Sequence, residues 1–160
     1  MRSLISRFVM CFLATILLCV FPCMVFAAGT VTGPVIKRVQ VDGRVQRVTL
    51  TYTFTADGEA AMASATLDPA TYGITGWYLY KIKTTPGTPG ATNGAWDFDA
   101  TDAASFVQTR NLVDNRSSTA SQEIIFNSGY PMILSVWTLS IGDNAVNNAV
   151  ETIELTFTLN

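Results

Sequence analysis

Within one β-branched stretch of the sequence, Val45 to Thr55, residues 48–55 alternate with a period of two between apolar and hydroxyl side chains. The apolar members are Val48, Leu50, Tyr52 and Phe54, and threonines lie between and after them. Successive side chains of a β-strand point to opposite faces, so one face of this strand is apolar and the other is hydroxylated. We predict that the apolar face packs in a core and that the threonine face meets solvent or another subunit.

This stretch forms half of a predicted hairpin. A second β-branched run, Val35 to Val41, precedes it, and Asp42-Gly43 between them readily adopts the positive φ angles of a tight turn. Further short strands are predicted at 76–84, 96–99, 105–109, 123–127, 132–141 and 150–159, of which the last two form a long terminal pair. The pattern predicts an all-β fold: an antiparallel β-sandwich, Ig-like or jelly-roll, with about seven to nine strands.

The predicted strand at 76–84 is the most aromatic part of the sequence. Strict alternation places Tyr78, Tyr80 and Ile82 on one face. The opposite face then carries Trp77, Leu79, Lys81 and Lys83. Two Pro-Gly pairs within 84–94 predict a long exposed loop after the strand. Earlier in the chain, alanines at 60–65 predict one or two helical turns before Asp68-Pro69.

Residues 1–27 have the layout of a secretory signal peptide. Arg2 and Arg7 form a basic front, residues 8–26 are almost entirely apolar, and Ala27 is a small residue at a suitable cleavage position. Cleavage there leaves residues 28–160 as a single domain. The apolar run approaches the roughly 18 residues that can span a membrane, so a retained anchor is the alternative. A cleaved signal peptide and a retained anchor both predict an exported protein, located in the periplasm, at the cell surface or outside the cell.

The residue inventory excludes most kinds of catalytic site. The chain has no histidine, and its three cysteines, Cys11, Cys19 and Cys23, all lie in the predicted signal peptide. The domain that remains after cleavage therefore lacks a thiol nucleophile, a Ser-His-Asp triad, a Cys/His zinc site and a disulfide. Its sequence also has no glycine-rich phosphate-binding motif. We predict a protein that is not an enzyme and needs no cofactor.

Charge argues against nucleic acid as a partner. Residues 28–160 carry eight basic and twelve acidic side chains, whereas proteins that bind nucleic acid usually have a basic patch. The one basic cluster comprises Lys37, Arg38, Arg44 and Arg47 on the predicted hairpin. We interpret it as solvated strand faces beside a turn.

Three aspartates, Asp97, Asp99 and Asp102, form the main carboxylate cluster of the sequence. With Asp114 they could supply the hard oxygen ligands that calcium prefers. Their spacing differs from that of an EF-hand loop, and alternation places Asp97 and Asp99 on the solvent face of a strand. The sequence favours a solvated strand face, predicts no metal site and leaves calcium binding open.

Five residues are candidates for contact with a ligand or a partner. Four are aromatic: Trp77, Tyr78, Tyr80 and Trp96. They could stack on sugar rings, although large aromatic side chains in strands usually pack in the core, and the exposure of the tryptophans decides between these uses. The fifth is Arg116, whose guanidinium we expect to stabilise a turn by bonding to loop carbonyls or to a carboxylate such as Asp114.

Two segments carry a set of short motifs. They are Gly76 to Gly87, GWYLYKIKTTPG, and Leu112 to Gln122, LVDNRSSTASQ. With the threonine-rich and Asp-rich strands, they make residues 48–158 resemble a group of small tailed-phage and prophage proteins described as virion-associated or structural. Asp114 stands where that group has alanine. The resemblance implies a non-catalytic assembly role in a virion, whereas virion proteins need no export signal.

Two functions fit these observations. The leading hypothesis is an exported structural or interaction protein that acts through protein contacts, including self-association through edge strands such as Val150 to Leu159. The alternative is an extracellular module that binds carbohydrate or another ligand of the cell surface. Membrane contact is expected only through the N-terminal segment, if that segment is not cleaved.

Overall fold

The computed structural model describes residues 29–90, 96–109, 112–126 and 131–159. The predicted signal peptide and the end of the predicted loop at 84–94 lie outside these residues. The described part of the chain is almost entirely β-structure, with one short helix, α2 (Pro69–Tyr72). No helix within it is long and apolar enough to cross a membrane.

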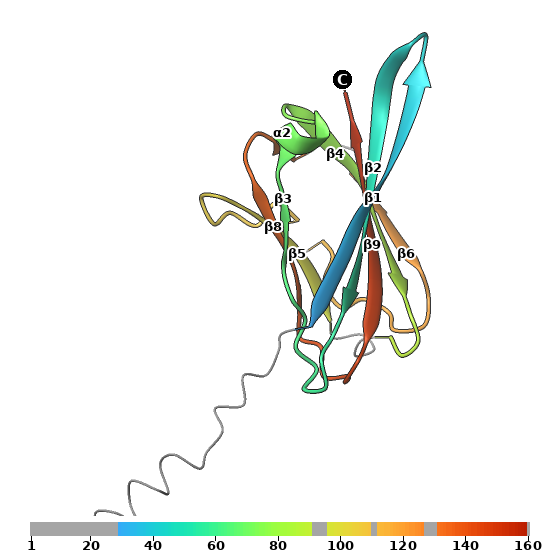
Figure 1. Ribbon diagram of the computed structural model, residues 1–160, viewed down its shortest axis with the longest axis vertical. Coiled ribbons are helices and arrows are strands. Elements are labelled where there is room, and N and C mark those ends of the chain that lie inside the picture. Colours follow the sequence, from blue (N-terminus) through green and yellow to red (C-terminus); the bar gives the residue numbers. More distant parts are fainter. Residues whose placement is uncertain (1–28, 91–95, 110–111, 127–130, 160) are drawn as a thin grey trace, which may run out of the picture.

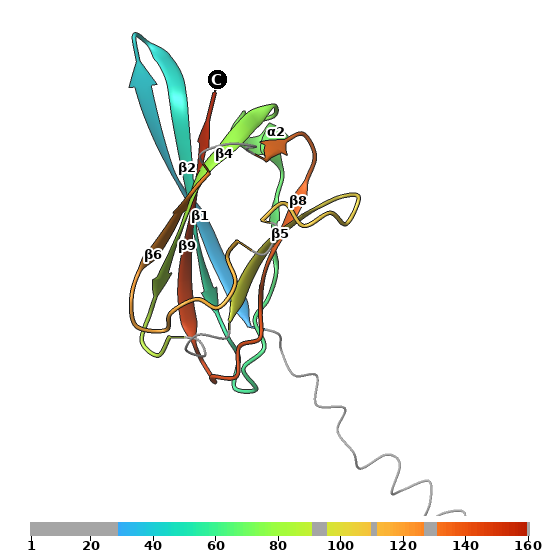
Figure 2. The ribbon, with the colours of Figure 1, turned by 180° about the vertical axis from the view of Figure 1, so that it is seen from behind.

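The strands form two sheets that face each other as the layers of a β-sandwich (Figures 1 and 2). The larger sheet has the order β1-β2-β9-β4-β6, with β7 also paired to β4. Its strands are β1 (Thr30–Val41), β2 (Arg44–Thr55), β4 (Trp77–Pro86), β6 (Gln122–Ile125), β7 (Met132–Ile133) and β9 (Val150–Thr158). The smaller sheet has the order β3 (Ala65–Leu67), β8 (Trp137–Gly142), β5 (Asp97–Asp102). All strand pairs are antiparallel, which confirms the predicted fold class.

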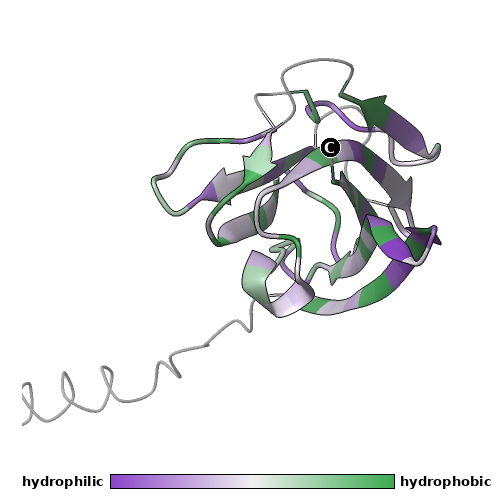
Figure 3. Cartoon of the chain, turned by 90° about the horizontal axis from the view of Figure 1, so that it is seen from above, coloured by the Kyte–Doolittle hydropathy of each residue, from purple (hydrophilic) through white to green (hydrophobic). Residues whose placement is uncertain are grey.

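The core lies between the sheets, because each sheet turns an apolar face inward. Hydrophobic and hydrophilic residues alternate along the strands in Figure 3. The apolar face predicted for β2 is buried, as Val48, Leu50, Tyr52 and Phe54 are each at most 2% exposed. Across the sandwich, the rings of Trp137 and Phe157 have centroids 6.0 Å apart. The buried apolar residues of the described chain run from Val48 to Phe157, so a chain that begins at Ala28 contains all of them.

The predicted hairpin is confirmed, and it extends beyond the rest of the sandwich (Figures 1 and 2). Asp42 and Gly43 connect β1 to β2 with φ angles of 50° and 75°, as a tight turn of this kind requires. Nearly all of β1 is exposed, and Val35 and Val41 are 71% and 48% exposed. Strand β1 therefore presents apolar side chains to solvent.

Strand β4 departs from strict alternation at Tyr80. Leu79 pairs with Phe157 and Lys81 with Thr156, which are neighbours on β9, so Tyr80 is an extra residue. Such a β-bulge puts one additional residue into one strand of an antiparallel pair.

The bulge changes which side chains of β4 face the core. Trp77 and Leu79 are buried before it, and Ile82 and Thr84 are buried after it. The prediction that Ile82 shares a face with Tyr78 and Tyr80 is therefore wrong. The prediction that Lys81 and Lys83 share a face with Trp77 is wrong for the same reason. As a result, the consecutive residues Tyr80 and Lys81 both lie on the outer face of the sheet.

The predicted terminal pair is also wrong. β8 belongs to the smaller sheet, whereas β9 lies in the larger sheet with β2 on one side and β4 on the other. The connection at 143–149 therefore crosses from one layer of the sandwich to the other. Because both sides of β9 are hydrogen-bonded, it is not an edge strand that could pair with a neighbouring molecule.

Two local predictions need correction. The helical turn follows Asp68-Pro69 rather than preceding it, because the Asp68 carboxylate caps α2 by accepting a hydrogen bond of 3.0 Å from Ala70 N. The segment at 105–109 is a turn with a single bridge between Thr101 and Val107, and it is not a strand.

Candidate functional site

The two tryptophans among the predicted site residues are buried. Trp96 is 0% exposed and Trp77 is 9% exposed, because both lie on the inward side of their sheets. A ring with almost no exposed surface cannot stack on a ligand. The structure therefore removes Trp77 and Trp96 as contact residues and places them in the core, the competing use that their size favours.

Arg116 has a local structural role. Its Nε donates a hydrogen bond of 3.2 Å to the carbonyl oxygen of Asp114, and its backbone N donates one of 2.9 Å to the carbonyl oxygen of Trp96. The first bond is of the loop-carbonyl kind predicted for this guanidinium. The second bond holds the turn at 114–116 against Trp96, which directly precedes β5.

The aspartates near β5 also bond to the surrounding loops. Asp97 Oδ1 accepts a hydrogen bond from Asn115 N, and Asp99 Oδ1 accepts one from Thr109 Oγ1. The described residues contain no group of three or more acidic, His or Cys side chains arranged to hold a metal ion. The pKa of Asp114 is raised by desolvation and by the negative charges of Asp97 and Asp99, and Arg116 partly offsets this rise.

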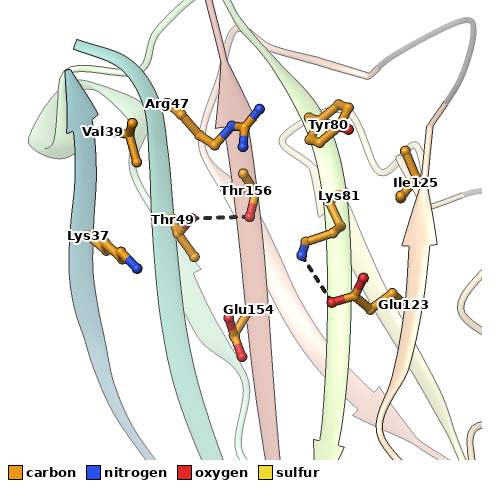
Figure 4. Close-up of a pocket in the computed structure, with 10 residues that line it drawn as sticks. All are labelled: Lys37, Val39, Arg47, Thr49, Tyr80, Lys81, Glu123, Ile125, Glu154 and Thr156. Atoms are coloured by element: carbon orange, nitrogen blue, oxygen red, sulfur yellow. Dashed lines mark hydrogen bonds and ion pairs between the residues drawn. The ribbon is translucent and has the colours of Figure 1, made fainter. Parts of the chain in front are cut away.

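The predicted residue Tyr80 lies in a shallow groove on the outer face of the larger sheet (Figure 4). The groove has a volume of about 360 Å³ and crosses five neighbouring strands, each of which contributes two side chains. The lining residues are Lys37, Val39, Arg47, Thr49, Tyr80, Lys81, Glu123, Ile125, Glu154 and Thr156. We call this feature the outer groove. Tyr78 is two residues from Tyr80 on the same strand and is not part of the lining.

Strand register brings the centre of the outer groove together. Lys37 pairs with Thr49, Thr49 with Thr156, Thr156 with Lys81, and Lys81 with Ile125. These residues form one row across β1, β2, β9, β4 and β6. The hydroxyl oxygens of Thr49 and Thr156 are 3.2 Å apart and hydrogen-bond to each other at the middle of the row.

Tyr80 and Arg47 form the aromatic part of the outer groove. The guanidinium carbon of Arg47 lies 5.1 Å from the centroid of the Tyr80 ring, which is within the range of a cation–π contact. Tyr80 reaches this position because it is the extra residue of the bulge, beside the row rather than within it. The contact restrains the ring without hiding it, since Tyr80 remains half-buried.

The carboxylates of the outer groove are both in ion pairs. Glu123 Oε1 is 3.0 Å from Lys81 Nζ, and Glu154 Oε1 is 3.3 Å from Lys83 Nζ. In the described part of the chain, neither Lys37 nor Arg47 has a carboxylate within ion-pair distance. The groove thus has paired negative charges and two cations that remain available.

Sequence reasoning found Tyr80 and missed the other residues of the outer groove. The basic cluster of the hairpin was the available signal, because it contains Lys37 and Arg47. Interpreting it as a ligand site required knowing that β9 lies between β2 and β4 and that β4 carries a bulge. Neither fact follows from local alternation.

Comparisons with known proteins add little to this description. No family model matches the chain, and no curated protein matches it. One similar solved structure is CBM86, a low affinity xylan binding module from the gut symbiont Roseburia intestinalis, with 12% identity, a TM-score of 0.34, and coverage of 84% of this chain and 97% of that chain. Another is the C-terminal family 22 carbohydrate binding module of a Clostridium thermocellum protein, with 11% identity, a TM-score of 0.29, and coverage of 86% and 89%. At such TM-scores these likenesses carry no argument about the ligand of this chain.

Proposed function

We propose that this protein is a non-catalytic binding domain whose outer groove binds an extended carbohydrate chain. One observation carries the proposal. The groove is open, crosses five strands, and surrounds a single aromatic ring with hydroxyl, amine, guanidinium and carboxylate groups. The proposed site is built around Tyr80, one of the four aromatic candidates, and does not involve Trp77 or Trp96.

The shape of the outer groove suits a polymer. Neighbouring strands lie about 4.8 Å apart, so the five strands extend over roughly 19 Å, which is longer than a single sugar ring. The volume of about 360 Å³ is near the lower end of the range for sites that enclose a small molecule. A chain that lies across the strands can contact the whole length of such a site without being enclosed by it.

The chemistry of the lining suits a ligand rich in hydroxyl groups. Sugar hydroxyls both donate and accept hydrogen bonds, and Lys37, Thr49 and Lys81 in the row offer both kinds of partner. The ring of Tyr80 supplies an apolar surface for the C–H face of a sugar. Because these side chains are solvated before binding, each new contact adds little free energy, and we expect weak affinity per sugar unit.

Affinity electrophoresis against a panel of neutral and acidic polysaccharides tests the proposal, with the chain that begins at Ala28. We expect retardation by at least one polymer and a loss of about tenfold in affinity for Tyr80→Ala, given about 1 kcal/mol or more for an aromatic contact. Tyr78→Ala is the matched control, because it removes the same ring from the same strand outside the groove. Migration unaffected by every polymer, or equal losses in both variants, would contradict the proposal.

A second candidate function is the structural role in protein contacts that the phage resemblance implies. The observation that favours it is strand β1 at the edge of the larger sheet, where Val35, Ile36, Val39 and Val41 are each at least 40% exposed. Sedimentation equilibrium tests this role. A mass that rises with concentration, and that returns to the monomer value in Val35→Ser/Val41→Ser, would support it, whereas a monomer at all concentrations would contradict it.

Export also belongs to the proposal. Mass spectrometry of washed envelope, culture medium and purified phage-like particles would look for a peptide that begins at Ala28. Its presence in envelope or medium fits a binding module outside the cytoplasm, and its presence in particles would favour the structural role. A product that retains Arg2 and Arg7 would contradict cleavage.

A further inference from the structure

The charges of the protein are separated between regions of the fold. Of the seven basic residues in the described chain, six lie on β1, β2 and β4 of the larger sheet, and the seventh is Arg116. The larger sheet thus concentrates the basic residues, although acidic residues outnumber basic ones in the whole sequence. The outer groove contains three of these cations: Lys37, Arg47 and Lys81.

The ion pairs of the outer groove leave an excess of positive charge. Glu123 is held by Lys81 at 3.0 Å, and Glu154 by Lys83 at 3.3 Å, so both carboxylates of the lining already have a cationic partner. Lys37 and Arg47 lie on β1 and β2, whereas the two ion pairs join β4 to its neighbours β6 and β9. Within the described residues, the one interaction that either side chain makes is the contact of Arg47 with the ring of Tyr80.

We infer that the outer groove selects carbohydrate chains that carry anionic groups, carboxylate or sulfate, and that Lys37 and Arg47 are the residues that recognise them. This inference rests on the proposed function. Arg47 can bond to a carboxylate through two parallel N–H donors while its flat guanidinium stays on the Tyr80 ring. An anionic sugar unit beside Tyr80 thus meets the ring and the guanidinium together, and Lys37 meets the charge of a further unit along the row.

The geometry also explains why the paired carboxylates do not repel such a ligand. An ion pair has little net charge at a distance, and Glu123 and Glu154 keep their lysines when the ligand approaches from the side of Lys37. A neutral polysaccharide would make the contacts with Tyr80 and Thr49 but would leave the charges of Lys37 and Arg47 without an anionic partner. The difference in affinity between charged and neutral ligands therefore reports on the charges of these two residues.

The test uses polygalacturonate and the same polymer with its carboxylates methyl-esterified, because the two differ in charge and share a backbone. For the chain that begins at Ala28, we expect affinity about tenfold higher for the charged polymer at low salt, as two charge-assisted contacts would give. The preference should fall steeply as sodium chloride is raised, because exposed charges are screened.

A matched pair of double variants assigns the preference to the groove. Lys37→Gln/Arg47→Gln removes two charges from the lining and should reduce the preference for the charged polymer to less than about twofold. Arg38→Gln/Arg44→Gln removes two charges from the same hairpin outside the lining and should leave the preference unchanged. Equal loss in both variants, or equal affinity of the parent chain for both polymers, would overturn the inference and leave the proposed function standing. Failure to bind either polymer, or any other polymer of the panel, would overturn both.

Discussion

Strands β2 and β4 lie in the same sheet, on either side of β9, and differ by one inserted residue. β2 pairs with β9 without interruption from Arg47 to Thr55, and its inward and outward residues alternate throughout. β4 pairs with β9 equally well on both sides of Tyr80, but the bulge there reverses the alternation. The insertion adds nothing to the core and adds an aromatic ring to the outer face. Regular alternation along β2 therefore determines which side chains enter the core, whereas the bulge in β4 determines which aromatic ring lies on the outer face.

The largest effect should come from deleting one residue in each strand. Deletion of Thr51 from β2 turns either Val48 and Leu50 or Tyr52 and Phe54 to the wrong face, at about 1.5–3 kcal/mol per side chain, which is comparable to the whole stability of a domain. We expect no cooperative unfolding transition by circular dichroism. Deletion of Tyr80 from β4 restores regular alternation, because Leu79 and Ile82 then lie two positions apart and both still face inward.

The Tyr80 deletion is therefore the matched control for the Thr51 deletion. We expect it to fold and to change the free energy of unfolding by less than about 2 kcal/mol, the ordinary range for a single change that leaves the core intact. A deletion of Tyr80 that abolishes folding, or a deletion of Thr51 that leaves the thermal midpoint unchanged, would contradict the assignment of faces.

The sequence could predict the local features of these strands but not their bulge or their order in the sheet. The inward face of β2 and the Asp42-Gly43 turn were predicted correctly, because alternation and turn chemistry are local. The face of Ile82 was not, since no glycine or other unusual residue in β4 marks the bulge. The position of β9 was also out of reach, because strand order depends on contacts between residues far apart in the chain.

The candidate site likewise combines residues that the sequence could single out with residues that only the strand order brings together. Tyr80, Trp77 and Trp96 were equal candidates from the sequence, because large aromatic side chains serve cores and binding sites alike, and only the structure separates them by burial. Lys37 and Arg47 come from one hairpin, but Thr156 and Glu154 come from the other end of the chain. A site assembled by register across five strands becomes visible only when the register is known.

The next largest effect should come from truncating one side chain on the inner face and one on the outer face of the larger sheet. Leu50 is 0% exposed, and Leu50→Ala should lower the free energy of unfolding by about 2–5 kcal/mol through lost burial and the cavity left behind. Tyr80→Ala, on the outer face, should lower it by less than about 1 kcal/mol. Urea unfolding measures both, and similar losses for the two variants would show that Tyr80 has a structural rather than a binding role.

The smallest effect should come from the ion pairs of the outer groove. Lys81→Met and Lys83→Met should each change stability by less than about 1 kcal/mol, because side chains as solvated as Lys81, at 25%, and Glu123, at 47%, form weak pairs. Both differences should vanish in about 1 M salt, where charges are screened over roughly 3 Å. A loss of several kcal/mol in either variant would mean that these pairs hold the sheet together.

The central claim is that the outer face of the larger sheet, and no other face, binds the ligand. Amide chemical-shift mapping by NMR during titration with the best polysaccharide of the panel tests it most directly. We expect shifts at Thr49, Tyr80, Lys81 and Thr156, and none at Thr138 and Ser140 on the outer face of the smaller sheet. Shifts confined to the smaller sheet would contradict the account, as would shifts that persist unchanged in a variant lacking Tyr80.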